Sequence, residues 1–192
     1  MGRIIDISNY DFSTGDITAI SIDTNVLLCM FYGNITYSIE SHQKIYQSIL
    51  ENITENKDKV KLYTTTINIC EALHVIEKAE YDIFKCFTGK NLGIKTYRNI
   101  VSERVKVKKE FETFIKQVEQ CIDVVDEYVV SNCLVLQYIN QVTNSKYDCL
   151  DYVLLDYTLQ KGIDAIMTDD SDFCHKSYNG LLLTANPTLT SI

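Results

Sequence analysis

The sequence has little of what marks linkers, secreted scaffolds or membrane proteins. One proline and seven glycines among 192 residues leave no linker-like segment, and no internal repeat or low-complexity tract is present. No apolar run approaches membrane-spanning length, and the first residues carry acids early in place of a signal-peptide core. Seven cysteines, an odd number without a C-x-x-C pair, are typical of reduced thiols. We therefore expect a cytoplasmic protein that makes no membrane contact.

Length and composition favour one folded domain that spans residues 1–192. The chain is 46% hydrophobic, which is too apolar for a disordered protein and sufficient for a sizeable core. Its formal net charge of −8 argues against a surface that coats nucleic acid along its whole length. Any nucleic-acid contact is therefore expected to be local.

Basic residues are concentrated between residues 95 and 116. This segment holds seven basic and three acidic residues, a net charge of +4, so the remaining chain carries −12. The solvated face of an amphipathic helix is the simpler explanation, and the alternative is an arm that binds a phosphate backbone. For that alternative the candidate RNA contacts are Lys95, Arg98, Arg104 and Lys108.

Hydrophobic patterning predicts strands and helices in alternation. Short apolar runs predict strands over residues 16–22, 60–64, 121–125, 164–168 and 181–184. Longer segments predict helices over residues 26–32, 38–53, 67–79, 94–120, 127–143 and 147–162, with an irregular join over 82–93 and a break near 105–107. The alternation favours an α/β fold with three layers, α/β/α, around a central parallel sheet of about four to five strands.

The most informative stretch is the end of the fourth predicted strand. A helix stops at Gly162, a short apolar run follows, and the run ends in Thr168-Asp169-Asp170-Ser171-Asp172. Three carboxylates within four positions repel one another at the end of a buried strand. They are easier to explain if a cation lies among them, because hard divalent cations prefer oxygen ligands.

Three further carboxylates occupy places that call for a partner. Asp23 follows an apolar strand, where α/β folds place ligand sites, although on its own a helix N-cap explains it more simply. Glu71 lies on a largely apolar helix face, where a carboxylate is seldom buried unless it is paired or bound to a metal. The alternative to a functional role is an ion pair with a nearby lysine at the edge of the helix. Asp151 lies on the packed face of its helix, three positions after Asp148, which we interpret as a helix cap.

Other common catalytic groups are not indicated. His42, His74 and His175 are too scattered for a zinc site, and no local Ser-His-Asp or Cys-His signature is present. Glu71-x-x-His74 has the spacing of half a di-iron site, but the sequence has no second Glu-x-x-His.

Four features occur in a fixed order along the chain. A strand ends in Asp23-Thr24-Asn25-Val26, one helix carries Glu71, another carries Asp151 and closes at Gly162, and Thr168-x-Asp170-x-Asp172-Phe173 follows. Each feature is weak alone, and the ordered set is fairly specific. The set resembles a PIN domain, the metal-dependent ribonuclease family that includes the VapC-like toxins of bacterial toxin–antitoxin pairs. The match covers roughly residues 20–79 and 124–184.

The resemblance implies a parallel sheet between helices, an acidic cluster that binds Mg²⁺ or Mn²⁺, and cleavage of RNA phosphodiester bonds. Carried over by motif, the metal ligands and catalytic residues are Asp23, Glu71, Asp151 and Asp170, with Asp172 as an additional or alternative ligand. Thr168 and Asn25 are implied to orient the carboxylates or a bound water. One or two metals would activate water and stabilise the leaving oxygen without a covalent nucleophile.

The chain departs from the family pattern in three places. Asp169 stands beside Asp170, and the Thr-x-Asp spacing favours Asp170 as the acid that points into the site. Asp156 occupies a place where the family usually has a small residue, and we interpret it as structural or solvated. The chain is longer than a typical VapC-like toxin, and the excess around residues 81–120 is expected to form a helical insert.

These features leave three hypotheses for the function of the chain. The first is a metal-dependent endoribonuclease, including the toxin of a toxin–antitoxin pair, with an RNA substrate, an antitoxin that covers the cleft, and a homodimer as expected partners. The second is a non-catalytic PIN-like module that uses residues 95–116 to hold RNA or protein. The third is a Mg²⁺-dependent phosphatase, although the haloacid dehalogenase type would require Asp-x-Asp where this chain has Asp23-Thr24-Asn25.

Overall fold

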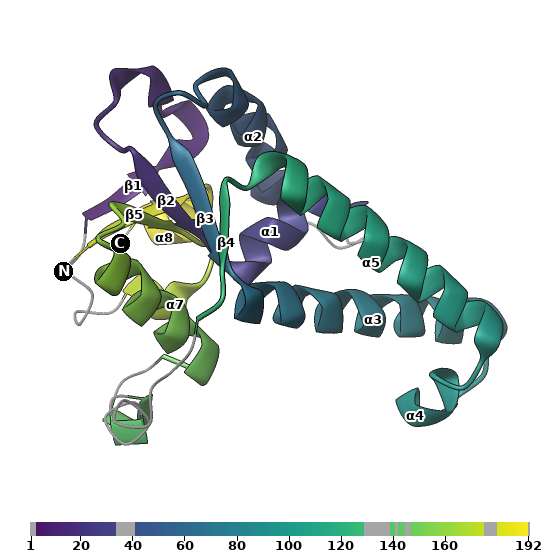
Figure 1. Cartoon of the computed structure of the whole chain (residues 1–192). Helices are drawn as coiled ribbons and strands as arrows, with labels where there is room; N and C mark the ends of the chain where they lie inside the picture. The colour runs from purple at the N-terminus through teal and green to yellow at the C-terminus, as the bar shows by residue number, and fades with distance from the viewer. Residues whose placement is uncertain are drawn as a thin grey trace.

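The computed structural model describes residues 3–33, 41–128, 139–140, 142–144, 147–174 and 180–191. The described residues form one six-stranded sheet in which every neighbouring pair of strands is parallel (Figure 1). The strand order is β1-β6-β5-β2-β3-β4. The strands are β1 (Arg3–Asp6), β2 (Ala19–Ile22), β3 (Lys61–Thr65), β4 (Val124–Asp126), β5 (Ala165–Met167) and β6 (Leu181–Thr184).

Helices cover both faces of this sheet, which confirms the predicted three-layer α/β/α fold. α1, α2, α3 and α5 share one apolar cluster with the sheet, and α7 shares a second cluster with the opposite face. No helix within the described ranges is long and apolar enough to cross a membrane. The helices are α1 (Thr24–Phe31), α2 (Ile45–Glu55), α3 (Thr66–Thr88), α4 (Ile94–Tyr97), α5 (Val101–Cys121), α7 (Cys149–Lys161) and α8 (Pro187–Thr190).

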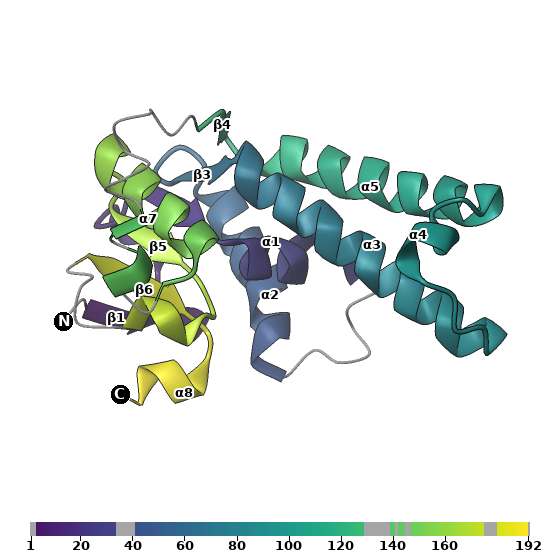
Figure 2. The ribbon, with the colours of Figure 1, turned by 90° about the horizontal axis from the view of Figure 1, so that it is seen from below.

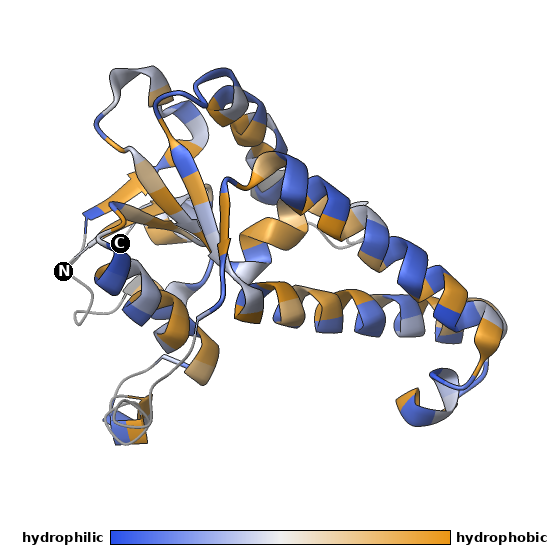
Figure 3. Ribbon diagram, in the orientation of Figure 1, coloured by the Kyte–Doolittle hydropathy of each residue, from blue (hydrophilic) through white to orange (hydrophobic). Residues whose placement is uncertain are grey.

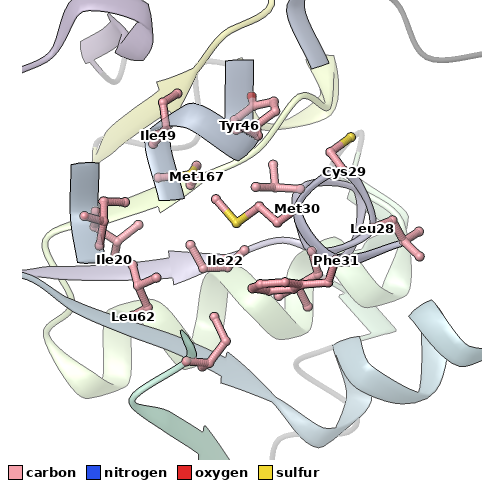
Figure 4. Close-up of a cluster of buried hydrophobic side chains, with 14 of the residues drawn as sticks. Ile20, Ile22, Leu28, Cys29, Met30, Phe31, Tyr46, Ile49, Leu62 and Met167 are labelled. Atoms are coloured by element: carbon pink, nitrogen blue, oxygen red, sulfur yellow. The ribbon is translucent and has the colours of Figure 1, made fainter. Parts of the chain in front are cut away.

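The two clusters follow from the alternation of side chains along each strand. Ile20 and Ile22 of β2 are buried in the cluster beneath α1 and α2, together with Met167 of β5 (Figure 4). Ile166 lies between Ala165 and Met167 in β5, but it belongs to the other cluster, together with Leu154 of α7. Successive side chains of a strand point to opposite faces, so strands covered on both sides carry apolar residues at consecutive positions. Figure 3 shows the resulting contrast between largely hydrophobic strands and a largely hydrophilic α5.

The sequence prediction needs correction at several boundaries. β1 was not predicted, so the sheet has six strands instead of about four to five. α3 continues past residue 79 to Thr88, because no helix breaker occurs before Gly89, which ends the helix with a φ of 66°. The break in the charged helix lies between α4 and α5, not near residues 105–107. The helix predicted over 127–143 falls largely on residues outside the described ranges.

The strand order places a topological switch point between β2 and β5. From β2 the chain proceeds outward to β3 and β4, and it then returns to β5 on the other side of β2 and continues to β6. Connections that leave adjacent strands in opposite directions open a crevice beyond the carboxyl ends of those strands. Asp23 follows β2 and Thr168 follows β5, so both emerge at this crevice.

α3 and α5 form a helical hairpin that projects from the sheet, with α4 at its far end (Figures 1 and 2). Glu77 of α3 is 7% exposed and accepts hydrogen bonds from the guanidinium groups of Arg98 and Arg104. The ring of Tyr97, which is fully buried, lies 5.3 Å from the rings of both Tyr81 and Phe84. One carboxylate and an aromatic cluster therefore hold α4 and α5 against α3.

Glu77→Ala should lower the free energy of unfolding by about 1–3 kcal/mol, since it removes charge-assisted hydrogen bonds from two guanidinium groups. The matched control is Glu112→Ala, because Glu112 makes an exposed pair with Lys108 at 3.5 Å. That control should change stability by less than about 0.5 kcal/mol. Urea denaturation at pH 7 measures both effects.

The effect of Glu77→Ala should also depend on pH. The hydrogen bond from Arg98 holds the pKa of Glu77 below its usual value of 4.5. A carboxyl group with a lowered pKa contributes stability that is fully present above the unfolded pKa and is lost as the pH falls through the folded pKa. The difference between wild type and Glu77→Ala should therefore shrink in acid. An equal difference at pH 7 and pH 3 would contradict this role of Glu77.

Candidate functional site

Four predicted carboxylates come from four different elements at the crevice. Asp23 follows β2, Asp170 follows β5, Glu71 lies in the second turn of α3, and Asp151 lies in the first turn of α7. Their charges act on one another, since Glu71 and Asp170 raise the pKa of Asp23, and Asp23 and Asp170 raise the pKa of Asp151. The fold therefore brings the four side chains into one electrostatic cluster.

Asp23 is both the N-cap of α1 and the most buried member of this cluster. Its Oδ1 accepts from the backbone N of Thr24 at 2.6 Å, and its Oδ2 accepts from the Thr168 hydroxyl at 2.7 Å. Burial raises the pKa of Asp23 to about 7 despite these two hydrogen bonds, and the charges of Glu71 and Asp170 add to the increase. The sequence-based interpretation of Asp23 as a helix N-cap is therefore confirmed, and the same residue belongs to the acidic cluster.

Asp151 shares a capping box with Asp148 at the start of α7. Asp148 Oδ1 accepts from the backbone N of Asp151 at 2.8 Å, and Asp151 Oδ2 accepts from the backbone N of Asp148 at 3.3 Å. The predicted role of Asp148 as a helix cap is confirmed. Burial raises the pKa of Asp151 to about 7, and the charges of Asp148, Asp23 and Asp170 follow as further causes.

Glu71 is connected to the end of β2 through a hydroxyl group. The hydroxyl of Thr24 donates to Glu71 Oε2 at 2.6 Å and accepts from Asn68 Nδ2 at 3.1 Å. Asn68 in turn accepts from the hydroxyl of Thr65, the N-cap of α3. This chain of hydrogen bonds fixes the first turns of α1 and α3 relative to each other. His74, one turn further along α3, is exposed.

Thr168 connects the two acids that follow neighbouring strands. Its hydroxyl donates to Asp23 and also accepts from the backbone N of Asp170 at 2.9 Å. Asp170 Oδ1 accepts from the backbone N of Asp172 at 2.8 Å, and both side chains are half-buried. Asn25 Oδ1 accepts from the backbone N of Asp169 at 3.4 Å. Thr168 and Asn25 thus both contact the acidic loop.

Asp169 points away from the cluster. Its Oδ1 accepts from the hydroxyl of Tyr46 in α2 and from the hydroxyl of Thr184 at 3.1 Å. Burial and the charge of Asp169 raise the pKa of Tyr46, and burial followed by the same charge raises the pKa of Cys29 to about 12. Asp169 therefore lies beside α1 and α2, and Asp170 is the acid whose charge acts on the cluster.

The donor set suits a hard divalent cation, since it consists of carboxylate oxygens. In the part of the chain that the structure describes, no three His, Cys, Asp or Glu side chains form a ready-made metal-binding group. Among the contacts of these described residues, Glu71, Asp151 and Asp170 each accept through a single carboxylate oxygen. The other carboxylate oxygen of each residue could therefore bind a cation. The positive charge of that cation would offset the repulsion within the cluster.

The basic residues predicted to contact RNA have different surroundings. Arg98 and Arg104 both pair with Glu77, so part of their charge is compensated within the hairpin. Lys108 makes an exposed pair with Glu112, and Lys95 is exposed on α4. Lys95 and Lys108 are therefore better placed than the two arginines for a contact with phosphate, and the RNA contact itself stays a prediction.

Several residues of the site were missed by sequence reasoning. Thr24 stands inside the Asp23-Thr24-Asn25 motif, but its bond to Glu71 joins residues 47 positions apart. Tyr46 and Asn68 carry no local signal, because their partners are set by tertiary packing. Asp156 was interpreted as structural or solvated, and it accepts from Tyr128 and from Gln160 at 2.8 Å.

Comparison of the chain with models of known protein families and with curated protein sequences found no match.

Asp23→Asn should stabilise the cation-free protein at pH 8. A carboxyl group whose folded pKa is raised from 3.8 to about 7 binds more protons in the folded state, so stability falls as pH rises between these values. The substitution removes a buried charge that is present at pH 8 and largely absent at pH 5. The expected gain in unfolding free energy is about 1–4 kcal/mol at pH 8 and close to zero at pH 5.

Thermal or urea denaturation with a chelator present measures this gain, and Asp156→Asn is the matched control on α7. A loss of stability at pH 8 equal to the loss at pH 5 would show that Asp23 acts only as a helix cap.

Proposed function

We propose that this chain is a Mg²⁺- or Mn²⁺-dependent endoribonuclease with a PIN-like active site. The observation that carries the proposal is the convergence of Asp23, Glu71, Asp151 and Asp170 at the switch point of a parallel sheet, with the pKa of both Asp23 and Asp151 raised to about 7. Buried acids that repel one another are unfavourable for stability alone, and strongly shifted groups in a crevice favour a functional role.

The residues have distinct roles in this proposal. Asp23, Glu71, Asp151 and Asp170 would hold the cation, with Asp172 as an additional ligand at the edge of the loop. A bound Mg²⁺ or Mn²⁺ would supply an activated water and positive charge for the phosphate. Thr168 orients Asp23 through its hydroxyl and fixes the backbone of Asp170, and Thr24 orients Glu71.

The choice of RNA as substrate rests on the sequence resemblance and on the basic residues of the hairpin. The phosphatase alternative is disfavoured at the atomic level, because Asn25 stands where a second aspartate would be needed and its Oδ1 accepts from the backbone of the acidic loop. The non-catalytic alternative is disfavoured because the acidic set is complete and electrostatically coupled.

Asp170→Asn should reduce Mn²⁺-dependent cleavage of a mixed-sequence RNA by more than about 100-fold, since even residues that only support metal ligands cost about 10–100-fold. The matched control is Asp156→Asn, because Asp156 bonds to Tyr128 and Gln160 instead of joining the cluster. We expect the control to cleave at the wild-type rate. A chelator should abolish cleavage by the wild type and by the control.

Two results would replace the proposal. RNA binding without turnover at any Mn²⁺ or Mg²⁺ concentration would favour the non-catalytic module. Hydrolysis of a small phosphomonoester, with RNA left intact, would favour the phosphatase.

The toxin role is a narrower form of the same proposal. It expects growth arrest when the wild-type chain is expressed alone, no arrest with Asp170→Asn, and relief by a protein that covers the crevice. Cleavage of RNA in vitro without growth arrest would leave the nuclease in place and remove the toxin role. The expected homodimer stays a prediction.

A further inference from the structure

We propose that Tyr46 and Asp169 form a positioning pair that decides which of two adjacent aspartates, Asp169 or Asp170, enters the active site. The inference rests on the proposed function and extends it to α2, which contributes no carboxylate to the cluster. It concerns residues that position the acidic loop.

The contacts of Asp169 tie the loop to four separate parts of the chain. Its carboxylate accepts from the hydroxyls of Tyr46 and Thr184, its backbone N donates to Asn25, and its carbonyl accepts from Asn186 at 3.5 Å. These partners belong to α2, β6, α1 and the N-cap of α8. Asp169 therefore anchors this part of the loop to all four.

Tyr46 is suited to select this orientation because its own position is fixed. The side chain is fully buried and packs in the cluster with Met30, Ile49 and Met167 (Figure 4). Its hydroxyl accepts from the backbone N of Ala185 at 3.0 Å. Because a hydroxyl has one proton and the Ala185 contact uses a lone pair, that proton is directed to Asp169.

The anchoring of Asp169 has a direct consequence for Asp170. Phe173 is fully buried in the opposite cluster, 5.7 Å from the ring of Tyr147, so the loop is fixed beyond Asp170 as well. Thr168 holds the backbone N of Asp170 at 2.9 Å. With both flanks fixed, the Asp170 side chain acts on Asp23 and Asp151 instead of turning toward α2.

Without the anchor, two neighbouring aspartates compete for one place in the cluster. Loss of the Tyr46 hydroxyl removes a hydrogen bond to Asp169 and leaves its carboxylate under-satisfied beside α2. The loop then gains an alternative in which Asp169 turns toward the cluster. A cation would meet a mixture of loop conformations, and its apparent affinity would fall by the fraction that remains competent.

The experiment is calorimetric titration of the full chain with Mn²⁺, comparing Tyr46→Phe with Tyr157→Phe. Tyr157 is a matched control, because it is also fully buried and its hydroxyl donates to a carboxylate, Asp126, at 3.0 Å. Both variants lose a tyrosine–aspartate hydrogen bond. Tyr46→Phe also removes the acceptor of the buried backbone N–H of Ala185, so it should lose more stability than Tyr157→Phe. We expect Mn²⁺ affinity to fall about 10-fold in Tyr46→Phe and to stay at the wild-type value in Tyr157→Phe.

A second pair of variants separates positioning from folding. Asp169→Asn keeps an oxygen that accepts from Tyr46 and Thr184, so it should retain Mn²⁺ affinity within about threefold, whereas Asp169→Ala should lose about 10-fold or more. Unfolding midpoints measured beforehand ensure that only folded protein is titrated.

The outcomes are distinguishable. If wild type binds Mn²⁺ and Tyr46→Phe binds it equally tightly, the positioning role is overturned and the proposed function stands. If Asp169→Asn loses as much affinity as Asp169→Ala, the charge of Asp169 matters more than its contacts, and the inference is also overturned. If wild type binds no Mn²⁺, the proposed function fails and the inference fails with it.

Discussion

Repulsion between carboxylates that share a buried crevice is the constraint on which the site depends. Asp23 and Asp151 are each less than one-tenth exposed, and the charges with the largest effect on either of them are other carboxylates. With pKa values of about 7, both carboxyl groups change their protonation state near neutral pH when no cation is bound. If the cluster is to bind a cation, the groups that hold its carboxylates in place must leave their negative charge largely uncancelled.

Hydroxyl groups and backbone amides supply those contacts. Thr168 and Thr24 each bond to a carboxylate of the cluster, and Thr168 also holds the backbone of the acidic loop. The arginines of the hairpin are engaged elsewhere, because Glu77 binds both Arg98 and Arg104. Neutral donors orient the carboxylates without cancelling their charge, which leaves that charge available for a divalent cation.

The sequence predicts the fold class well because the strands that build the centre of the sheet are short apolar runs between helices. β1 was missed because Arg3–Asp6 has charged residues at both ends and only two apolar residues between them. Gly162 was predicted as the stop of α7, and its φ of 65° shows why, since this left-handed conformation favours glycine.

Within the site, sequence spacing favoured Asp170 over Asp169, and in the structure the carboxylate of Asp169 accepts from Tyr46 and Thr184. What held Asp169 in place could not be predicted, because Tyr46 lies 123 positions away and is one of 13 tyrosines. The same limit applies to Thr24 and Glu71. Local patterns identify candidate acids, and tertiary packing determines which hydroxyl reaches each of them.

The most direct test of the account is the number of protons released when Mn²⁺ binds, measured by calorimetry in buffers of different ionisation enthalpy. Cation binding to carboxyl groups with pKa values near 7 must displace their protons. We expect release of about one to two protons per cation at pH 6.5, falling toward zero at pH 8.5. Binding without proton release at pH 6.5, or no binding at either pH, would contradict the claim that these buried carboxylates form a cation site.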